Sequence, residues 1–198
     1  MNLHSIATHT VDLDLLPEAP RVLDAGCRDF DFTKGILALR PKADIIAIDP
    51  DPDTPAPEIP GVFFARVALV GDKRPSARYF IGSTGHGNFL SDLESYYDMR
   101  PVDVPCVSLN APPFEETFDL VKLDIEGSEF EVLEHWPGPV AKQISVEFHD
   151  WDKPHIRDSH YYERIFRFLG TFGYRVIQHE LSTQGTGCGH WDSLLVLR

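Results

Sequence analysis

The stretch Phe118-Asp-Leu-Val-Lys-Leu-Asp-Ile-Glu-Gly-Ser-Glu-Phe-Glu-Val-Leu133 begins as an apolar strand, passes through an acidic turn and continues as a helix. This pattern predicts that Asp124 and Glu126 lie at the carboxyl end of a strand, where open α/β sheets bind their ligands. The same arrangement of an apolar segment ending in a carboxylate recurs in Val22-Leu-Asp24, Ile45-Ile-Ala-Ile-Asp49 and Ile144-Ser-Val-Glu147. Four segments therefore each bring an acid to one expected rim.

Strand and helix patterns alternate along most of the chain. Besides the strand of the quoted stretch, strands are predicted at residues 21–25, 45–49, 62–67, 77–81, 102–107, 142–148, 174–179 and 192–197. Helices are predicted at residues 32–39, 128–136 and 161–172. Such alternation predicts an α/β fold built on a parallel sheet, and the last two strands follow one another closely enough to form an antiparallel pair. The proline-rich segment 51–60 predicts an irregular crossover.

The length of 198 residues favours a single domain. Residues 1–20 are weakly patterned and end in Pro17 and Pro20, which predicts an N-terminal arm or an irregular helix ahead of the domain at 21–198. Residues 82–101 combine glycines with aromatic residues between two strand-like segments. We expect this part to form an insertion or lid.

The composition is acidic, with 31 Asp and Glu against 18 Lys and Arg and a formal net charge of -13. This charge disfavours nucleic acid and anionic membranes as partners, because both need clustered basic residues. A neutral or cationic ligand suits it better. No apolar run approaches the ~20 residues of a membrane span and the start lacks a leader pattern, so we expect a cytoplasmic protein. The three cysteines have neither disulfide-framework nor zinc-site spacing.

Residues 22–33 read as a strand, a turn and a helix start. Gly26 would let backbone amides approach a ligand closely. A dinucleotide site would need further glycines, and the acids Asp24, Asp29 and Asp31 would repel a pyrophosphate. S-adenosylmethionine carries a sulfonium and no phosphate, so it suits an acidic turn. The alternative is an ordinary turn with a capping aspartate.

Asp49 follows Asp24 by 25 residues, close to the spacing at which an acid binds ribose hydroxyls in nucleotide-binding folds. The alternative is a capping role before Pro50. Further acids and a histidine, Asp124, Glu126, Glu147 and His149, end the central strands. A carboxylate beside a histidine could remove a proton from a substrate hydroxyl.

The same four groups could instead be solvated strand ends. They could also hold a divalent cation, although their spacing does not indicate one. In the expected lid, His86 and Asn88 could line a substrate pocket, or pack and face solvent instead.

With these features the chain resembles the FkbM-type methyltransferases, a branch of the class I S-adenosylmethionine-dependent enzymes. The likeness rests on residues 119–133, with support from 22–33, Asp49 and 144–149. It implies a Rossmann-like, seven-stranded, mostly parallel sheet with one antiparallel strand and helices on both faces. It also implies S-adenosylmethionine as cofactor and a small hydroxyl acceptor, such as a sugar or another secondary metabolite.

By this resemblance we expect three groups of site residues. The cofactor would contact Asp24, Gly26, Asp49 and Asp124. The chemistry would use His149 as the base, with Asp124 and Glu147. The substrate would contact His86, Asn88 and Glu126.

One departure from the resemblance is Phe30, which stands where the family usually has a second glycine. Its side chain must point away from the ligand, or it would press on the methionine portion of the cofactor. Phe30 therefore motivates an alternative function, a cofactor-binding module without catalysis. A nicotinamide-dependent oxidoreductase is a further alternative, which the single glycine and the acidic turn disfavour.

Overall fold

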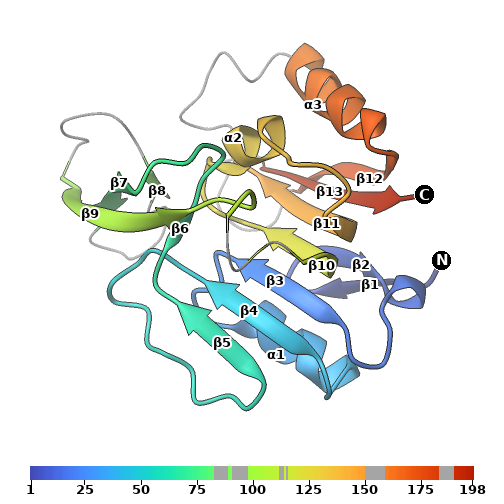
Figure 1. Cartoon of the computed structure of the whole chain (residues 1–198), viewed down its shortest axis with the longest axis horizontal. Coiled ribbons are helices and arrows are strands. Elements are labelled where there is room, and N and C mark those ends of the chain that lie inside the picture. Colours follow the sequence, from blue (N-terminus) through green and yellow to red (C-terminus); the bar gives the residue numbers. More distant parts are fainter. Residues whose placement is uncertain (83–88, 91–97, 112–113, 115, 150–158, 183–189) are drawn as a thin grey trace.

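The computed structural model describes residues 1–82, 89–90, 98–111, 114, 116–149, 159–182 and 190–198. Its central sheet has the strand order β12-β13-β11-β10-β3-β4-β5 (Figure 1). The strands are β3 (Arg21–Ala25), β4 (Asp44–Ile48), β5 (Val62–Ala65), β10 (Phe118–Leu123), β11 (Ala141–Phe148), β12 (Tyr174–Ser182) and β13 (His190–Leu197). β13 runs antiparallel to both neighbours, whereas the other pairs are parallel. The predicted α/β fold with a seven-stranded mixed sheet is confirmed.

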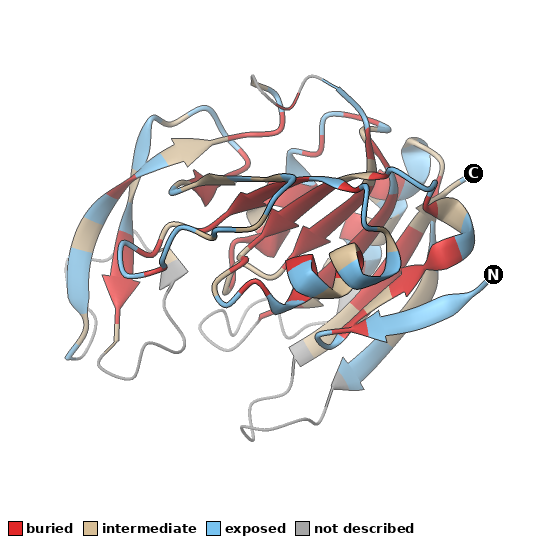
Figure 2. Cartoon of the chain, turned by 90° about the horizontal axis from the view of Figure 1, so that it is seen from below, coloured by how far each residue is buried: buried red, intermediate tan, exposed pale blue. Residues whose placement is uncertain are grey.

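The two faces of this sheet are covered differently because side chains alternate along each strand. Val22 of β3 points to the face covered by α1 (Asp31–Leu39), whereas the next residue, Leu23, points to the face covered by α2 (Glu129–Glu134) and α3 (Ser159–Thr171). Figure 2 shows that the buried residues are concentrated in these central strands. The helical cover is thin, because these are all the α-helices among the described residues.

Residues 3–15 differ from the predicted arm or irregular helix. They form a hairpin of β1 (Leu3–Ile6) and β2 (His9–Asp12), followed by the 3-10 helix η1 (Leu13–Leu15). The hairpin packs beside α1 through buried apolar residues such as Val11. Asp12 N donates to Gln143 Oε1 at 2.8 Å, and Gln143 Nε2 donates to Asp12 O at 3.0 Å. These reciprocal hydrogen bonds fix β2 against β11.

A second sheet stands beside the carboxyl ends of the central strands (Figure 1). It has the order β6-β9-β7-β8, with β6 (Ala68–Leu69), β7 (Ser76–Ile81), β8 (Phe89–Leu90) and β9 (Arg100–Val107). The predicted lid falls largely outside the described residues, but β8 and the start of β9 belong to this sheet. Residues 49–61 contain no helix, as their prolines predicted.

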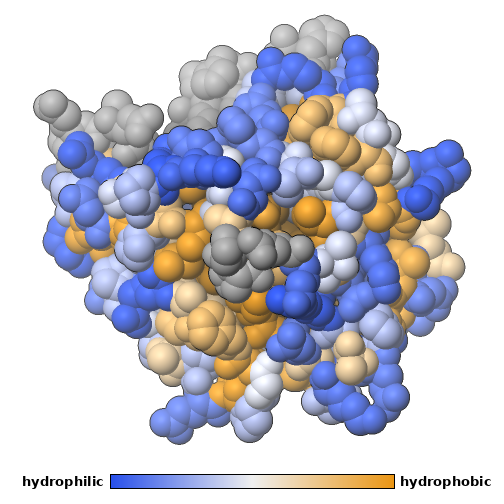
Figure 3. All heavy atoms as spheres, in the orientation of Figure 1, coloured by the Kyte–Doolittle hydropathy of each residue, from blue (hydrophilic) through white to orange (hydrophobic). Residues whose placement is uncertain are grey.

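The surface in the view of Figure 3 mixes hydrophilic and hydrophobic side chains, with hydrophilic ones along most of its margin. The most exposed large apolar side chain after Met1 is that of Phe63, on the edge strand β5. None of the described helices has the length and apolar character needed to cross a lipid bilayer. Cys27 and Cys106 are free thiols, and Cys188 lies outside the described residues.

Candidate active site

A cleft opens where the chain changes direction within the central sheet. From β3 the chain builds β4 and β5 on one side, then returns to add β10 and β11 on the other. Ligands of open α/β sheets bind at this switch point, beyond the carboxyl ends of the strands. The lining residues expected from the sequence are Gly26, Asp49, Asp124 and Glu126. The second sheet contributes Ala68, Tyr79 and Leu90.

Gly26 is required by a contact inside the protein as well as by its place at the cleft. Its φ is +78°, and a Cβ there would stand 1.7 Å from the backbone oxygen of Asp124. The turn is held by Gly26 N and Cys27 N, which donate to Ile48 O at 2.9 and 3.2 Å. Because only glycine allows this approach, the loop after β3 can rest directly on the end of β10.

Asp49 organises the loops on the other side of the cleft. Its carboxylate accepts hydrogen bonds from Arg28 N and Asp51 N, each at 2.9 Å, and from the Thr54 hydroxyl at 3.4 Å. Burial raises the pKa of Asp49, although the two backbone donors oppose that shift. A carboxylate can accept about four hydrogen bonds, so Asp49 retains capacity for a ligand hydroxyl.

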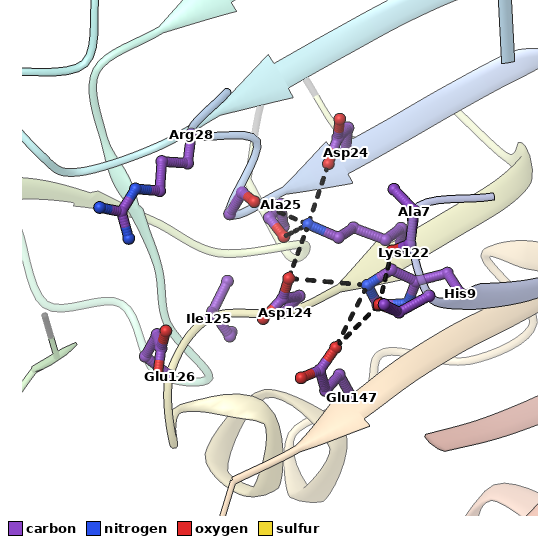
Figure 4. A network of polar contacts seen from close by, with 12 residues as sticks. Ala7, His9, Asp24, Ala25, Arg28, Lys122, Asp124, Ile125, Glu126 and Glu147 are labelled. Atoms are coloured by element: carbon purple, nitrogen blue, oxygen red, sulfur yellow. Dashed lines mark hydrogen bonds and ion pairs between the residues drawn. The ribbon is translucent and has the colours of Figure 1, made fainter. Parts of the chain in front are cut away.

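Lys122, which sequence analysis did not select, joins the two halves of the site (Figure 4). Its Nζ donates to Ala25 O at 3.2 Å and Gly26 O at 2.6 Å. The same atom lies 3.2 Å from Asp24 Oδ1 and 3.4 Å from Asp124 Oδ2. Burial disfavours the ammonium form, but the two aspartates outweigh it and raise the pKa of Lys122. Lys122 therefore stays charged and ties β3 to β10.

Asp24 is a structural partner of Lys122 and does not line the cleft. Its side chain is fully buried and also accepts a 2.7 Å hydrogen bond from the Thr33 hydroxyl in α1. The predicted direct contact between Asp24 and the cofactor is therefore not supported by its position. Its signal in the sequence, an acid ending a strand, is the same as that of the cleft residue Asp49.

Asp124 is the meeting point of the polar network. Burial raises its pKa, but Lys122 and His9 outweigh burial and hold the pKa of Asp124 well below its ordinary value. His9, from β2, places Nε2 3.6 Å from Asp124 Oδ2 and 3.9 Å from Glu147 Oε2. Figure 4 shows His9 and Lys122 approaching Asp124 from different strands, while Glu126 and Arg28 lie apart from this network.

His149 is buried among carboxylates and does not line the cleft. Its Nδ1 is 3.0 Å from Oε1 of the fully buried Glu129, and its Nε2 is 3.5 Å from Glu147 Oε1 and 3.8 Å from Glu126 Oε2. Burial lowers the pKa of His149, but Glu129 and its neighbours outweigh that effect and raise it well above the ordinary value. Burial and the surrounding acids raise the pKa of Glu126 to about 7.

Phe30 points away from the cleft. Its φ of +59° is in the left-handed region, which explains why a glycine would be expected there. The ring is buried and meets Phe64 edge-on, with 5.5 Å between ring centroids. Phe30 does not line the cleft, so its side chain gives no support to the alternative of a binding module without catalysis.

The predicted residues thus divide by position. Gly26, Asp49, Asp124 and Glu126 line the cleft, while Asp24, Glu147 and His149 are not among its lining residues. His86 and Asn88 lie outside the described residues. Sequence reasoning missed His9, Lys122, Glu129 and Tyr79. Of these four, Lys122 alone could have been found from the sequence, because it is a charged residue inside an apolar strand.

Comparison with known proteins identifies the fold and the family. Residues 24–176 match the methyltransferase FkbM domain. A similar structure is the fibrillarin pre-rRNA processing protein of Methanococcus jannaschii, with a TM-score of 0.57, 10% identity and coverage of 96% of this chain and 70% of that one. Another is the FkbM methyltransferase of Methylobacillus flagellatus KT, with a TM-score of 0.51, 11% identity and coverage of 89% of this chain.

This chain spans 44% of the Methylobacillus flagellatus protein. Identities this low show a shared class I methyltransferase fold and no more. The comparison with curated proteins found no match. The domain match, however, includes both the first turn at Gly26 and the acidic turn at Asp124, and it covers most of the chain. The chain therefore belongs to the FkbM methyltransferase family.

Proposed function

We propose that this protein transfers the methyl group of S-adenosylmethionine to a hydroxyl oxygen of a small molecule, such as a sugar or another secondary metabolite. The observation that carries the proposal is the acidic cleft at the switch point between β3 and β10. Apolar side chains such as Leu69 and Leu90 line it beside a few polar groups, as is usual for small-molecule sites. The family membership supports methyl transfer, and the cleft supports a compact acceptor.

The charges of the cleft fit this cofactor. Four acids line it, Asp49, Asp51, Asp124 and Glu126, together with Arg28. Such an excess of negative charge favours the sulfonium and ammonium groups of S-adenosylmethionine and disfavours phosphates. Asp49 would hold the ribose hydroxyls, while the backbone at Gly26 and the carboxylate of Asp124 would hold the methionine end. When bound, S-adenosylmethionine supplies a methyl group on a positively charged sulfur that is open to attack by an oxygen.

The chain's own contribution is to position the acceptor and to take its proton. Glu126 lines the cleft, whereas His149 does not, and His149 Nε2 lies 3.8 Å from Glu126 Oε2. We therefore assign proton removal from the acceptor hydroxyl to Glu126, in place of the His149 expected from the sequence. His149 acts through Glu126 as a positioning residue, held in turn by Glu129. Apolar cleft residues such as Leu69 and Leu90 exclude water from the reacting atoms.

Calorimetric titration with S-adenosylmethionine, S-adenosylhomocysteine and NAD tests the cofactor site first. We expect micromolar binding of both adenosyl ligands and none of NAD. A panel of sugar and small phenolic hydroxyl acceptors then tests the transfer by mass spectrometry. Binding of NAD alone, or binding of neither adenosyl ligand, would refute the proposal.

The role of Glu126 is tested with Glu126→Gln, which keeps the shape of the side chain and removes the base. A positioned base contributes about 10²–10⁴-fold to a rate, so turnover should fall by roughly that factor while S-adenosylhomocysteine binds as before. Glu58→Gln, an exposed residue, is the matched control and should keep full turnover. Equal losses of binding and turnover in Glu126→Gln would contradict the assigned role.

A further inference from the structure

His9 has a buried ring nitrogen that the methyltransferase site does not use. The residue is 2% exposed, and its ring meets Phe32 edge-on at 5.5 Å between centroids. Nδ1 lies 3.3 Å from the Ser145 hydroxyl. Nε2 has no hydrogen-bond partner within 3.5 Å among the described residues, and it lies 3.6 Å from Asp124 Oδ2 and 3.9 Å from Glu147 Oε2. A buried nitrogen in this state needs a physical explanation.

His9, Asp124 and Glu147 are close enough to one another to bind a single metal ion. One atom from each of His9, Asp124 and Glu147 can be chosen so that all three lie within 4.8 Å of one another. They come from three separate strands or strand ends, on β2, β10 and β11. The hairpin that delivers His9 is fixed to β11 by the reciprocal bonds between Asp12 and Gln143. The spacing is therefore set by the fold and does not depend on a flexible loop.

We propose that His9 Nε2, Asp124 and Glu147 bind a divalent first-row transition-metal ion, with Mn²⁺ and Zn²⁺ as the fitting class. One imidazole nitrogen and two carboxylates are a ligand set for such ions, whereas Mg²⁺ prefers oxygen ligands alone. This proposal does not rest on methyl transfer, because the ligand atoms lie together whether or not the cleft takes a methyl donor.

The atoms around the three ligands support the same assignment. Histidine ligands usually have their other ring nitrogen hydrogen-bonded, and ligating carboxylates are themselves held by donors. Here the Ser145 hydroxyl is the hydrogen-bond partner of the other ring nitrogen, His9 Nδ1. Thr8 Oγ1 donates to Glu147 Oε2 at 3.3 Å, and Lys122 Nζ stands 3.4 Å from Asp124 Oδ2.

The local charge also favours a cation. Besides its own Asp124 and Glu147, the cluster has three further acids around it, Asp24, Glu126 and Glu129. Lys122 offsets part of this charge, but it is already shared with Asp24 and two backbone oxygens. His149, whose raised pKa favours its positively charged form, also faces Oδ1 of Asp124 and Oε1 of Glu147. The competing explanation is that Lys122 and His149 balance these acids and that no metal ion binds.

Metal titration separates these explanations. The full chain is treated with EDTA, exchanged into buffer and titrated calorimetrically with Mn²⁺ and, separately, with Zn²⁺. We expect one site per chain that Mg²⁺ fills at least tenfold more weakly. Glu147→Gln and His9→Gln should each weaken Mn²⁺ binding at least tenfold. His4→Gln is the matched control, because His4 is exposed on the other strand of the same hairpin.

Electron spin echo measurements on bound Mn²⁺ need no substitution, so they remain decisive if His9→Gln fails to fold. A coupling to one histidine nitrogen in the unaltered protein is expected. The proposal is overturned if neither Mn²⁺ nor Zn²⁺ binds, if the nitrogen coupling is absent, or if His4→Gln loses as much affinity as His9→Gln. Failure here leaves the adenosyl-ligand titration unaffected, so the two proposals fail separately.

Discussion

Replacing Lys122 with methionine should cost more stability than any other single charge removal in this site. Methionine keeps the unbranched length of the side chain and loses only the ammonium. In the folded chain that ammonium lies beside the carboxylates of Asp24 and Asp124 and donates to two backbone oxygens. The side chains of Lys122 and Asp24 are almost completely buried. Without it, the Asp24 carboxylate would keep only the Thr33 hydroxyl.

Removing one partner of a buried ion pair costs about 3–5 kcal/mol. Since domains are stable by only about 5–15 kcal/mol in total, Lys122→Met should leave a marginally folded protein. For a chain of this size about 1 kcal/mol shifts the unfolding temperature by about 2–4 °C, which predicts a fall of roughly 6–20 °C. Urea unfolding followed by circular dichroism measures the free energy directly.

A double-mutant cycle with Asp24→Asn tests the cause of the loss. If the damage is an unpaired buried charge, Asp24→Asn should restore part of the stability that Lys122→Met removes, with a coupling of about 1–3 kcal/mol. Lys34→Met is the control, because Lys34 is exposed and pairs only with surface groups; it should change stability by less than about 0.5 kcal/mol. A loss below about 1 kcal/mol for Lys122→Met, or strict additivity with Asp24→Asn, would refute the reasoning.

Three further predictions follow from the turns and thiols. Gly26→Ala should abolish S-adenosylhomocysteine binding and lower the urea midpoint, because its Cβ would overlap the Asp124 backbone oxygen at 1.7 Å; normal binding would show that the loop can shift. Phe30→Ala should cost about 3–5 kcal/mol of stability yet change cofactor affinity by less than about threefold, since the ring does not line the cleft; a larger affinity change in titrations of the folded variant would contradict this. Burial raises the pKa of Cys27 strongly and that of Cys106 to about 11. Because a raised pKa lowers the thiolate fraction, peptide mass spectrometry should find both unalkylated after iodoacetamide at pH 8, and fast labelling of the folded chain would be inconsistent with these environments.

The parts of the fold that the sequence predicted are those with uniform local patterns. Apolar runs such as residues 22–25 and 45–48 are buried on both faces, so their hydrophobicity alone marked them as central strands. The hairpin at residues 3–12 escaped prediction because its turn is Ala7-Thr8, with φ values of 46° and 75°. Such two-residue turns usually show Asn-Gly or Asp-Gly, and that signal is absent.

The sequence predicted the site residues that directly follow the ends of strands. It did not predict the residues whose place in the site depends on how buried elements pack together. Gly26, Asp49, Asp124 and Glu126 follow strand ends and reach the cleft. Asp24 also closes an apolar segment of the sequence, yet it lies inside β3, where its buried side chain contacts Lys122. The sequence pattern alone does not distinguish these two positions. His9 could not be assigned at all, because its neighbours Asp124 and Glu147 are more than a hundred positions away and meet it only through packing of the hairpin.

The β1-β2 hairpin has a consequence for how relatives of this protein are compared. The family match begins at residue 24, whereas His9 enters the polar network from residues 3–12. Two relatives could therefore be indistinguishable across the matched domain and still differ in their chemistry, if only one of them carries an imidazole at this place. Grafting the first 20 residues of this chain onto such a relative would transfer His9 and the hairpin that holds it against β11.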